Sequence, residues 1–148
     1  HPNALVLDIA GEASTLMNVQ ELGTIAQYRL PVKLFIINNH YMGMVRQWQE
    51  LLHGSRYSES YSDALPDFIK LAESFHAKGL RATRLDELDS VIREALEHDG
   101  PVVVDLCVAE GENCFPMIPS GAAHNEMILG PEQEERGAEV TREGMMLV

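Results

Sequence analysis

Four short apolar runs, separated by helical patterns, constrain the fold more than any other feature of this 148-residue sequence. The runs begin at Ala4, Val32, Gly79 and Pro101, and they read ALVLDIA, VKLFIINN, GLRATRL and PVVVDLCV. Near-continuous apolar runs that are rich in branched residues are typical of strands buried on both faces of a parallel sheet. We therefore expect four buried strands, and we expect Cys107 in the last of them to be a buried thiol.

Helical patterns fill the segments between these strands. Residues 14–29 begin at Ser14, a candidate N-cap, and continue with apolar residues along one stripe. Residues 65–76 show a second such pattern, and residues 86–98 show the strongest one, with Asp86 as a candidate cap. Strands that alternate with helices predict an α/β fold in which helices flank both faces of a parallel sheet.

Composition limits the domain count and the classes of partner. We expect one domain over residues 1–130, truncated at its N-terminus because the chain starts with His1 rather than Met, and an acidic tail over residues 131–148. The net charge of −12, with only 11 Lys and Arg residues, argues against nucleic acid as a partner. No apolar stretch reaches the roughly 20 residues of a membrane span and no signal peptide opens the chain, so the sequence predicts a soluble, cytoplasmic protein without membrane contact.

Polar residues follow the first two predicted strands. Glu12 comes after the first strand and Asn38 and Asn39 end the second, and residues 14–37 have the right length for a helical crossover and a returning strand. The carboxyl ends of parallel strands gather at one edge of a sheet, where ligands bind. A carboxylate and an amide oxygen there are suitable ligands for Mg²⁺, which usually shares its shell with waters and phosphates.

The GEAS turn at residues 11–14 also leads into a predicted helix, whose free N–H groups favour an anion such as a diphosphate. By itself this turn is more often explained by packing, because tight strand-to-helix turns use small residues. The Asn pair at the same edge is the observation that favours a metal and phosphate site.

Longer stretches of the sequence resemble one known family. They read MNVQELGTIAQYRLPVKLFIINNHYMGMVRQWQELL, RYSESY, LPDFIKLAESF and CFPMIPSGAAHNEMI. These stretches are similar to the C-terminal, diphosphate-binding domain of the catalytic subunits of acetolactate (acetohydroxyacid) synthases, which are thiamine-diphosphate enzymes. The resemblance covers nearly the whole chain, and GMVRQWQ and PMIPSG are more specific than the short glycine, acid and Asn-Asn signature.

The resemblance implies a set of site residues. The metal ligands would be the Glu12 carboxylate, the Asn39 side chain and the Tyr41 backbone carbonyl. Residues near thiamine diphosphate would be Glu12, Ala13, Ser14, Asn39, His40, Tyr41, Met42, Gly43 and Met44.

Two further residues would lie near the substrate channel. One is Trp48, which spacing alone would place on the apolar face of a short helix with Met44, Leu51 and Leu52. The other is Ser120, which is equally well explained as a turn residue after Pro119.

The activity that the resemblance implies is the condensation of pyruvate with a second 2-ketoacid, such as 2-ketobutyrate, with loss of carbon dioxide in branched-chain amino-acid biosynthesis. No catalytic residue is expected within this chain, because the activating glutamate of the family lies on another domain of a neighbouring subunit. The fragment alone should therefore be inactive. FAD could bind to a domain that is not present here, and a homodimer or homotetramer with a small regulatory subunit is expected.

Two alternatives stay open at this point. The family has Asp-Gly where this chain has Glu12 and Ala13, so the longer carboxylate must reach the metal differently. This departure and the missing domains leave open a catalytically silent domain that serves assembly or regulation. The other alternative is another thiamine-diphosphate carboligase or decarboxylase, although RQWQ and PMIPSG speak against it.

Overall fold

The structure is a computed structural model that describes residues 4–130, so the predicted acidic tail at residues 131–148 lies outside the described residues. The chain divides into two compact units. The first unit comprises residues 1–42 and 62–110, and the second comprises residues 43–61 and 111–148. The prediction of one domain over residues 1–130 stays a prediction. Each unit is described by itself.

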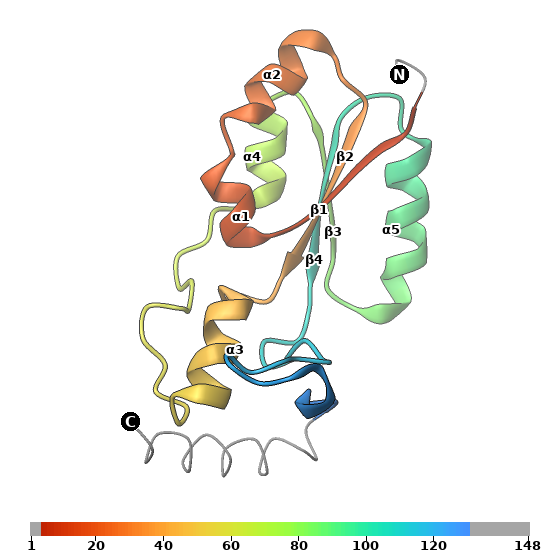
Figure 1. Ribbon diagram of the computed structural model, residues 1–148. Coiled ribbons are helices and arrows are strands. Elements are labelled where there is room, and N and C mark those ends of the chain that lie inside the picture. Colours follow the sequence, from red (N-terminus) through yellow and green to blue (C-terminus); the bar gives the residue numbers. More distant parts are fainter. Residues whose placement is uncertain (1–3, 131–148) are drawn as a thin grey trace. The chain divides into compact units, whose positions relative to one another are not determined.

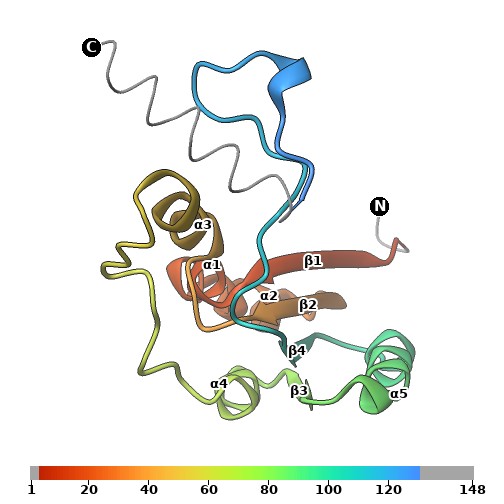
Figure 2. The same cartoon turned by 90° about the horizontal axis from the view of Figure 1, so that it is seen from below.

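A four-stranded parallel sheet forms the centre of the first unit. Its strands are β1 (Val6–Gly11), β2 (Val32–Asn38), β3 (Lys78–Ala82) and β4 (Val102–Cys107), and they lie in the order β1-β2-β4-β3. All three strand pairs are parallel. Figure 2 shows β1 at one edge of the sheet and β3 at the other.

Helices cover both faces of this sheet (Figure 1). On one face lie α1 (Glu12–Met17), α2 (Glu21–Tyr28) and α4 (Phe68–Ser74), and on the other lies α5 (Leu85–Glu97). This placement is the one that right-handed crossovers require, because the chain moves along the sheet in one direction from β1 to β3 and reverses between β3 and β4. The predicted α/β fold is confirmed. Over residues 4–130, no helix is both long enough and apolar enough to cross a membrane.

Two apolar cores form between the sheet and its helices. Leu34 and Ile36 of β2 pack with Phe68 of α4 on one face, whereas Phe35 and the fully buried Ala95 of α5 pack on the other. Alternate residues of a strand point to opposite faces, so the continuous apolar sequence of β2 serves both cores. The central strands are therefore buried as predicted.

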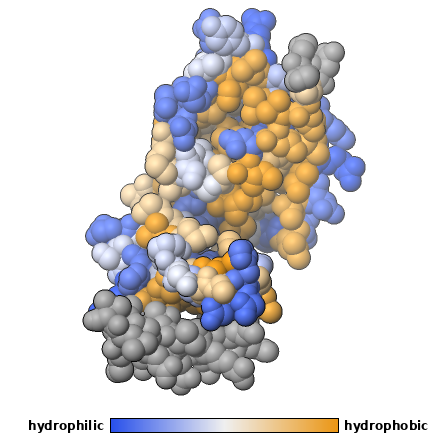
Figure 3. Space-filling view, viewed as in Figure 1, coloured by the Kyte–Doolittle hydropathy of each residue, from blue (hydrophilic) through white to orange (hydrophobic). Residues whose placement is uncertain are grey.

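The first strand differs from this prediction. β1 lies at the edge of the sheet, and α5 contacts β3 and β4 rather than β1. As a result Leu5, Leu7 and Ile9 are 58%, 49% and 70% exposed, and Figure 3 shows apolar residues gathered over this strand. The apolar run at residues 4–10 therefore predicted the strand correctly, but the prediction that this strand is buried is wrong. Cys107, at the end of β4, is likewise exposed rather than buried.

Two predicted helix starts also need correction. The predicted helix over residues 14–29 is two helices, because α1 ends at Met17 and α2 begins at Glu21. Gly11 is the N-cap of α1, so Ser14 lies inside the first turn. The last helix begins one residue before the predicted Asp86 cap.

The second unit contains α3 (Gly43–Leu52) and a loop-rich segment that the structure describes as far as residue 130. The buried side chain of Gln47 binds this segment, since it accepts a hydrogen bond from the Cys114 backbone N–H at 2.6 Å and donates one to the Cys114 carbonyl at 3.1 Å. Arg46 and Glu50 form an ion pair at 2.7 Å. Polar contacts thus connect two segments that are distant in sequence.

Candidate functional site

The register of β1 and β2 brings two polar segments to the same edge of the sheet. Gly11, the last residue of β1, pairs with Ile37 of β2. Glu12 directly follows the first of these residues, and Asn38 and Asn39 directly follow the second. Because both strands point the same way, Glu12 and the Asn pair lie together at the carboxyl edge, where α/β proteins place their ligands.

The Glu12 carboxyl group is the most unusual feature of this edge. Glu12 is 0% exposed, and over residues 4–130 neither of its carboxylate oxygens has a hydrogen-bond partner. Burial raises the pKa of this carboxyl above its ordinary value of 4.5. The backbone N–H groups of Glu12 and Asn39 and the charge of His40 lower that pKa only in part, without completing a hydrogen bond.

The segment that follows β2 is held in a defined conformation. The Tyr41 N–H donates to Asn39 Oδ1 at 3.2 Å, and the Ser62 N–H donates to the His40 carbonyl at 2.7 Å. His40 itself has a φ of 60°, in the left-handed region that few side chains favour. These contacts hold the turn from Asn39 to Tyr41 in one conformation.

The two asparagines have different roles. Asn38 is 5% exposed, its Nδ2 donates to Asp105 Oδ1 at 3.0 Å, and its Oδ1 accepts a hydrogen bond from the His40 N–H at 3.3 Å. This side chain is already used by the protein. Asn39 Oδ1 accepts one hydrogen bond, from the Tyr41 N–H, but its side chain is only half-buried, so it is the member of the pair that can reach a ligand.

Sequence reasoning missed Asp105 and its partner Arg81, whose Nε donates to Asp105 Oδ2 at 2.9 Å. A signal was present in the sequence, because Asp105 is the single charged residue within the apolar run PVVVDLCV. A carboxylate in a buried strand needs a partner.

The donors at this edge fit a hard divalent cation. Mg²⁺ takes one or two carboxylates from the protein and completes its shell with amide or carbonyl oxygens, waters and phosphate oxygens. The orphaned oxygens of Glu12 supply the carboxylate, and Asn39 and the Tyr41 carbonyl are the predicted neutral donors. Within the described part of the chain no group of three or more His, Cys, Asp or Glu side chains could hold a metal.

The other predicted site residues are divided between the units. Ala13 and Ser14 lie in the first turn of α1, whose initial N–H groups have no partner within the helix. Met42 is 37% exposed in the first unit. The residues of the second unit are Gly43, Met44, Trp48 and Ser120.

Among these residues of the second unit, Trp48 is 47% exposed and Met44 is 56% exposed. Trp48 is therefore not a core residue in the described part of the chain, so the core role that spacing favoured is wrong. Its place at a substrate channel stays a prediction. Ser120 is exposed, which fits either of its two interpretations.

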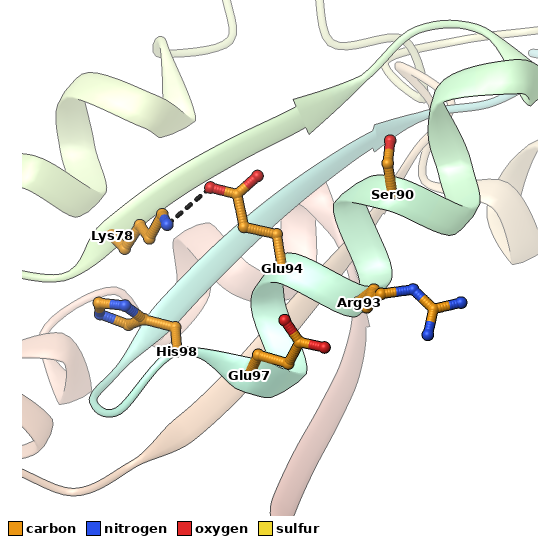
Figure 4. Close-up of a pocket in the computed structure, with 6 residues that line it drawn as sticks. All are labelled: Lys78, Ser90, Arg93, Glu94, Glu97 and His98. Carbon is orange, nitrogen blue, oxygen red and sulfur yellow. Dashed lines mark ion pairs between the residues drawn. The ribbon is translucent and has the colours of Figure 1, made fainter.

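A surface pocket of the first unit lies elsewhere (Figure 4). Its lining comes from α5 and from the start of β3, and in Figure 4 Lys78 and Glu94 point toward one another in an ion pair at 2.6 Å. The start of β3 belongs to the amino edge of the sheet, whereas Glu12 belongs to the carboxyl edge. This pocket is thus not part of the candidate site.

Comparisons with known proteins show which proteins the chain is similar to. The chain is 46% identical to the acetolactate synthase large subunit of Porphyra purpurea over 93% of its length, and 46% identical to that of Haemophilus influenzae over 91%. It spans 23% and 24% of the length of these two relatives.

A solved structure, a thiamine diphosphate-dependent 4-hydroxybenzoylformate decarboxylase of Rhodococcus jostii, matches the fold with a TM-score of 0.67 at 24% identity, over 73% of this chain and 20% of that one. The family model for the C-terminal TPP-binding domain of thiamine pyrophosphate enzymes matches residues 1–106. The chain therefore belongs to the thiamine pyrophosphate enzymes, as their C-terminal TPP-binding domain.

Proposed function

We propose that this chain anchors the diphosphate end of thiamine diphosphate, through Mg²⁺, in an acetolactate synthase large subunit. The full-length protein would condense pyruvate with a second 2-ketoacid, pyruvate or 2-ketobutyrate, and release carbon dioxide in branched-chain amino-acid biosynthesis. The relatives named above support this substrate class, because they are acetolactate synthase large subunits.

One observation carries the proposal, namely the buried Glu12 carboxyl group without a hydrogen-bond partner in residues 4–130. A buried polar group that lacks a partner costs about 1–3 kcal/mol, and a charged one costs more. Binding of a cation to the carboxylate would offset this cost. Glu12, Asn39 and the Tyr41 carbonyl would hold the metal.

The division of labour follows from the site. Thiamine diphosphate, once bound, supplies the chemistry of decarboxylation and carbon–carbon bond formation. The residues of this chain would bind and orient it. Glu12 and Asn39 would hold the cation that neutralises the diphosphate, and Ala13 and Ser14, in the first turn of α1, would lie beside the diphosphate. Trp48 and Ser120 would shape the path of the second ketoacid.

The assembly belongs to the same proposal. The full-length protein would act in the cytoplasm as a homodimer or homotetramer, with a small regulatory subunit, and FAD would bind outside this chain. The relatives support the idea of a larger assembly only through the name large subunit.

Titration of the metal tests the proposal. Full-length protein with Glu12→Gln should bind Mg²⁺ at least about 100-fold more weakly in the presence of thiamine diphosphate, because an amide oxygen replaces the only carboxylate. Glu12→Asp should keep binding, since Asp occupies this position in the family. Glu21→Gln, an exposed acid in α2, is the control and should leave affinity unchanged. Wild-type affinity of Glu12→Gln in calorimetry would remove Glu12 from the site.

A second measurement addresses the substrate. Acetolactate formed from pyruvate by the full-length protein should depend on Mg²⁺, whereas the isolated chain should form none. An intact protein that binds Mg²⁺ and thiamine diphosphate but makes no acetolactate would exclude this activity and leave the cofactor site standing.

A further inference from the structure

A polar network in the first unit, buried at Asp105 and Asn38 and exposed at Arg81, connects β3, β4 and β2 to the segment that follows β2. Asp105 of β4 is 2% exposed and uses both carboxylate oxygens. Oδ1 accepts a hydrogen bond from Asn38 Nδ2 at 3.0 Å, and Oδ2 accepts one from Arg81 Nε at 2.9 Å. The strand order explains these contacts, because β4 lies between β2 and β3.

The network is anchored at its far end. Arg81 Nη2 lies 3.2 Å from Asp67 Oδ1, and Asp67 is the N-cap of α4, where its carboxylate accepts a hydrogen bond from the Ile69 N–H at 3.1 Å. Burial opposes the charge of Arg81, but the Asp105 carboxylate raises the pKa of Arg81, so the guanidinium stays charged. Asp105 is thus a paired carboxylate in a fixed orientation.

At its near end the network reaches the candidate metal ligands. Asn38 can donate to Asp105 only through Nδ2, so its Oδ1 has to point away from Asp105. Its Oδ1 then accepts from the His40 N–H at 3.3 Å. His40 lies between the two predicted ligands Asn39 and Tyr41, and its φ of 60° has to be maintained by such contacts.

We propose that Asp105, held by Arg81, is a positioning residue that orients the Asn38 amide and thereby fixes the Asn39–Tyr41 segment for metal binding. This inference rests on the proposed function. The alternative is that the Asp105–Arg81 ion pair only stabilises the sheet and has no influence on metal binding. Outer partners of metal ligands typically change metal affinity about 10- to 100-fold when they are replaced, whereas a purely structural pair changes stability alone.

The test measures binding of Mn²⁺ as a stand-in for Mg²⁺. Free Mn²⁺ is followed by electron paramagnetic resonance in the full-length protein, at one fixed thiamine diphosphate concentration and against a protein-free blank. Asp105→Asn removes the charge that holds Arg81 and weakens the acceptor for Asn38 Nδ2. It should weaken Mn²⁺ binding about 10-fold, the low end of the range for direct partners of ligands, because Asp105 reaches the ligands only through Asn38 and His40. Arg81→Gln should weaken it less, because Asn38 keeps its acceptor.

A charge swap tests the hydrogen bond itself. Asn38→Asp alone places two carboxylates face to face and should weaken Mn²⁺ binding. Asn38→Asp combined with Asp105→Asn restores the hydrogen bond with reversed polarity and should recover most of the affinity. A carboxylate at position 38 that merely attracted the cation would instead tighten binding in both variants and would overturn the inference.

A matched control separates positioning from stability. Lys33 is equally buried, at 2% exposure, and belongs to the same strand as Asn38, but its Nζ donates to the His98 and Gly100 carbonyls at the amino edge of the sheet. Lys33→Met should lower stability and leave Mn²⁺ affinity unchanged. An equal loss of affinity in Lys33→Met and Asp105→Asn would overturn the positioning role, and so would wild-type affinity in Asp105→Asn.

Glu12→Gln distinguishes failure of this inference from failure of the proposed function. Loss of Mn²⁺ binding in Glu12→Gln together with wild-type binding in Asp105→Asn overturns the inference alone. Unchanged binding in Glu12→Gln overturns the metal site, and the positioning role with it. Should Asp105→Asn not fold, the Arg81→Gln and charge-swap variants give the same decision.

Discussion

Lys33 at the amino edge of the sheet and Glu12 at the carboxyl edge are both buried charged side chains, but their surroundings are opposite. At the amino edge, Lys33 Nζ donates to two backbone carbonyls, each at 2.6 Å. At the carboxyl edge, neither oxygen of the equally buried Glu12 has a partner among residues 4–130. Lys33 is therefore part of the structure of the fold, whereas Glu12 is left in a state that only a bound cation or a proton can relieve. The comparison distinguishes a residue whose polar group is satisfied within the fold from the residue that we propose as a metal ligand.

The largest expected effect comes from the metal. With thiamine diphosphate present, Mg²⁺ at 100 times its dissociation constant should stabilise the carboxyl edge by about 2.7 kcal/mol. Hydrogen exchange of α1 and of the Asn39–Tyr41 segment in the full-length protein measures this, because exchange reports local opening. The gain should vanish with EDTA and in Glu12→Gln. Equal protection with and without metal would break the distinction between the two edges.

Lys33→Met should cost about 2 kcal/mol, because two backbone carbonyls lose a charged donor. Faster hydrogen exchange in β2 and β4 of the full-length protein would report the loss, and it should be the same with and without Mg²⁺. Unchanged exchange would mean that Lys33 does not stabilise the amino edge.

Glu12→Gln should stabilise the metal-free protein by about 1 kcal/mol at pH 8, since it removes a buried unpaired charge. The size of this effect depends on pH. Below the ordinary value of 4.5 the carboxyl is neutral in both folded and unfolded chains, and the substitution should change little. Because the folded pKa is raised, wild-type stability falls as pH rises through it, so the advantage of the variant grows with pH. Hydrogen exchange of α1 at several pH values measures the difference, and an advantage that shrinks toward pH 8 would contradict it.

The smallest effect is expected at the surface pocket. Glu94→Gln removes the ion pair with Lys78. The Glu94 side chain is 52% exposed and the Lys78 side chain is 33% exposed. Exposed ion pairs contribute at most about 1 kcal/mol, and solvent screening makes about 0.3 kcal/mol a fair expectation here. Hydrogen exchange of α5 should change within error, and metal affinity should not change at all. A large effect of Glu94→Gln on metal affinity would connect the two edges.

Parts of the site were predictable because they depend on spacing along the chain. Glu12 and Asn39 each follow an apolar run, and a right-handed crossover of normal length places them at one edge. Asp105 and Arg81 were missed because their contacts require β4 to lie between β2 and β3, and this spatial order differs from the order of the strands in the sequence. The same limit explains the error about β1, since an edge strand and a central strand can have equally apolar sequences.

The sequence by itself determined the alternation of strands and helices, the parallel sheet, and the positions of the acid and the Asn pair, because these follow from local periodicity and crossover length. Only the tertiary structure decided that Asn38 is hydrogen-bonded to Asp105, that β1 is an exposed edge strand, and that Glu12 is buried without a partner in residues 4–130. Burial and hydrogen-bond satisfaction depend on which distant segments meet, and the periodicity of one segment carries no information about that.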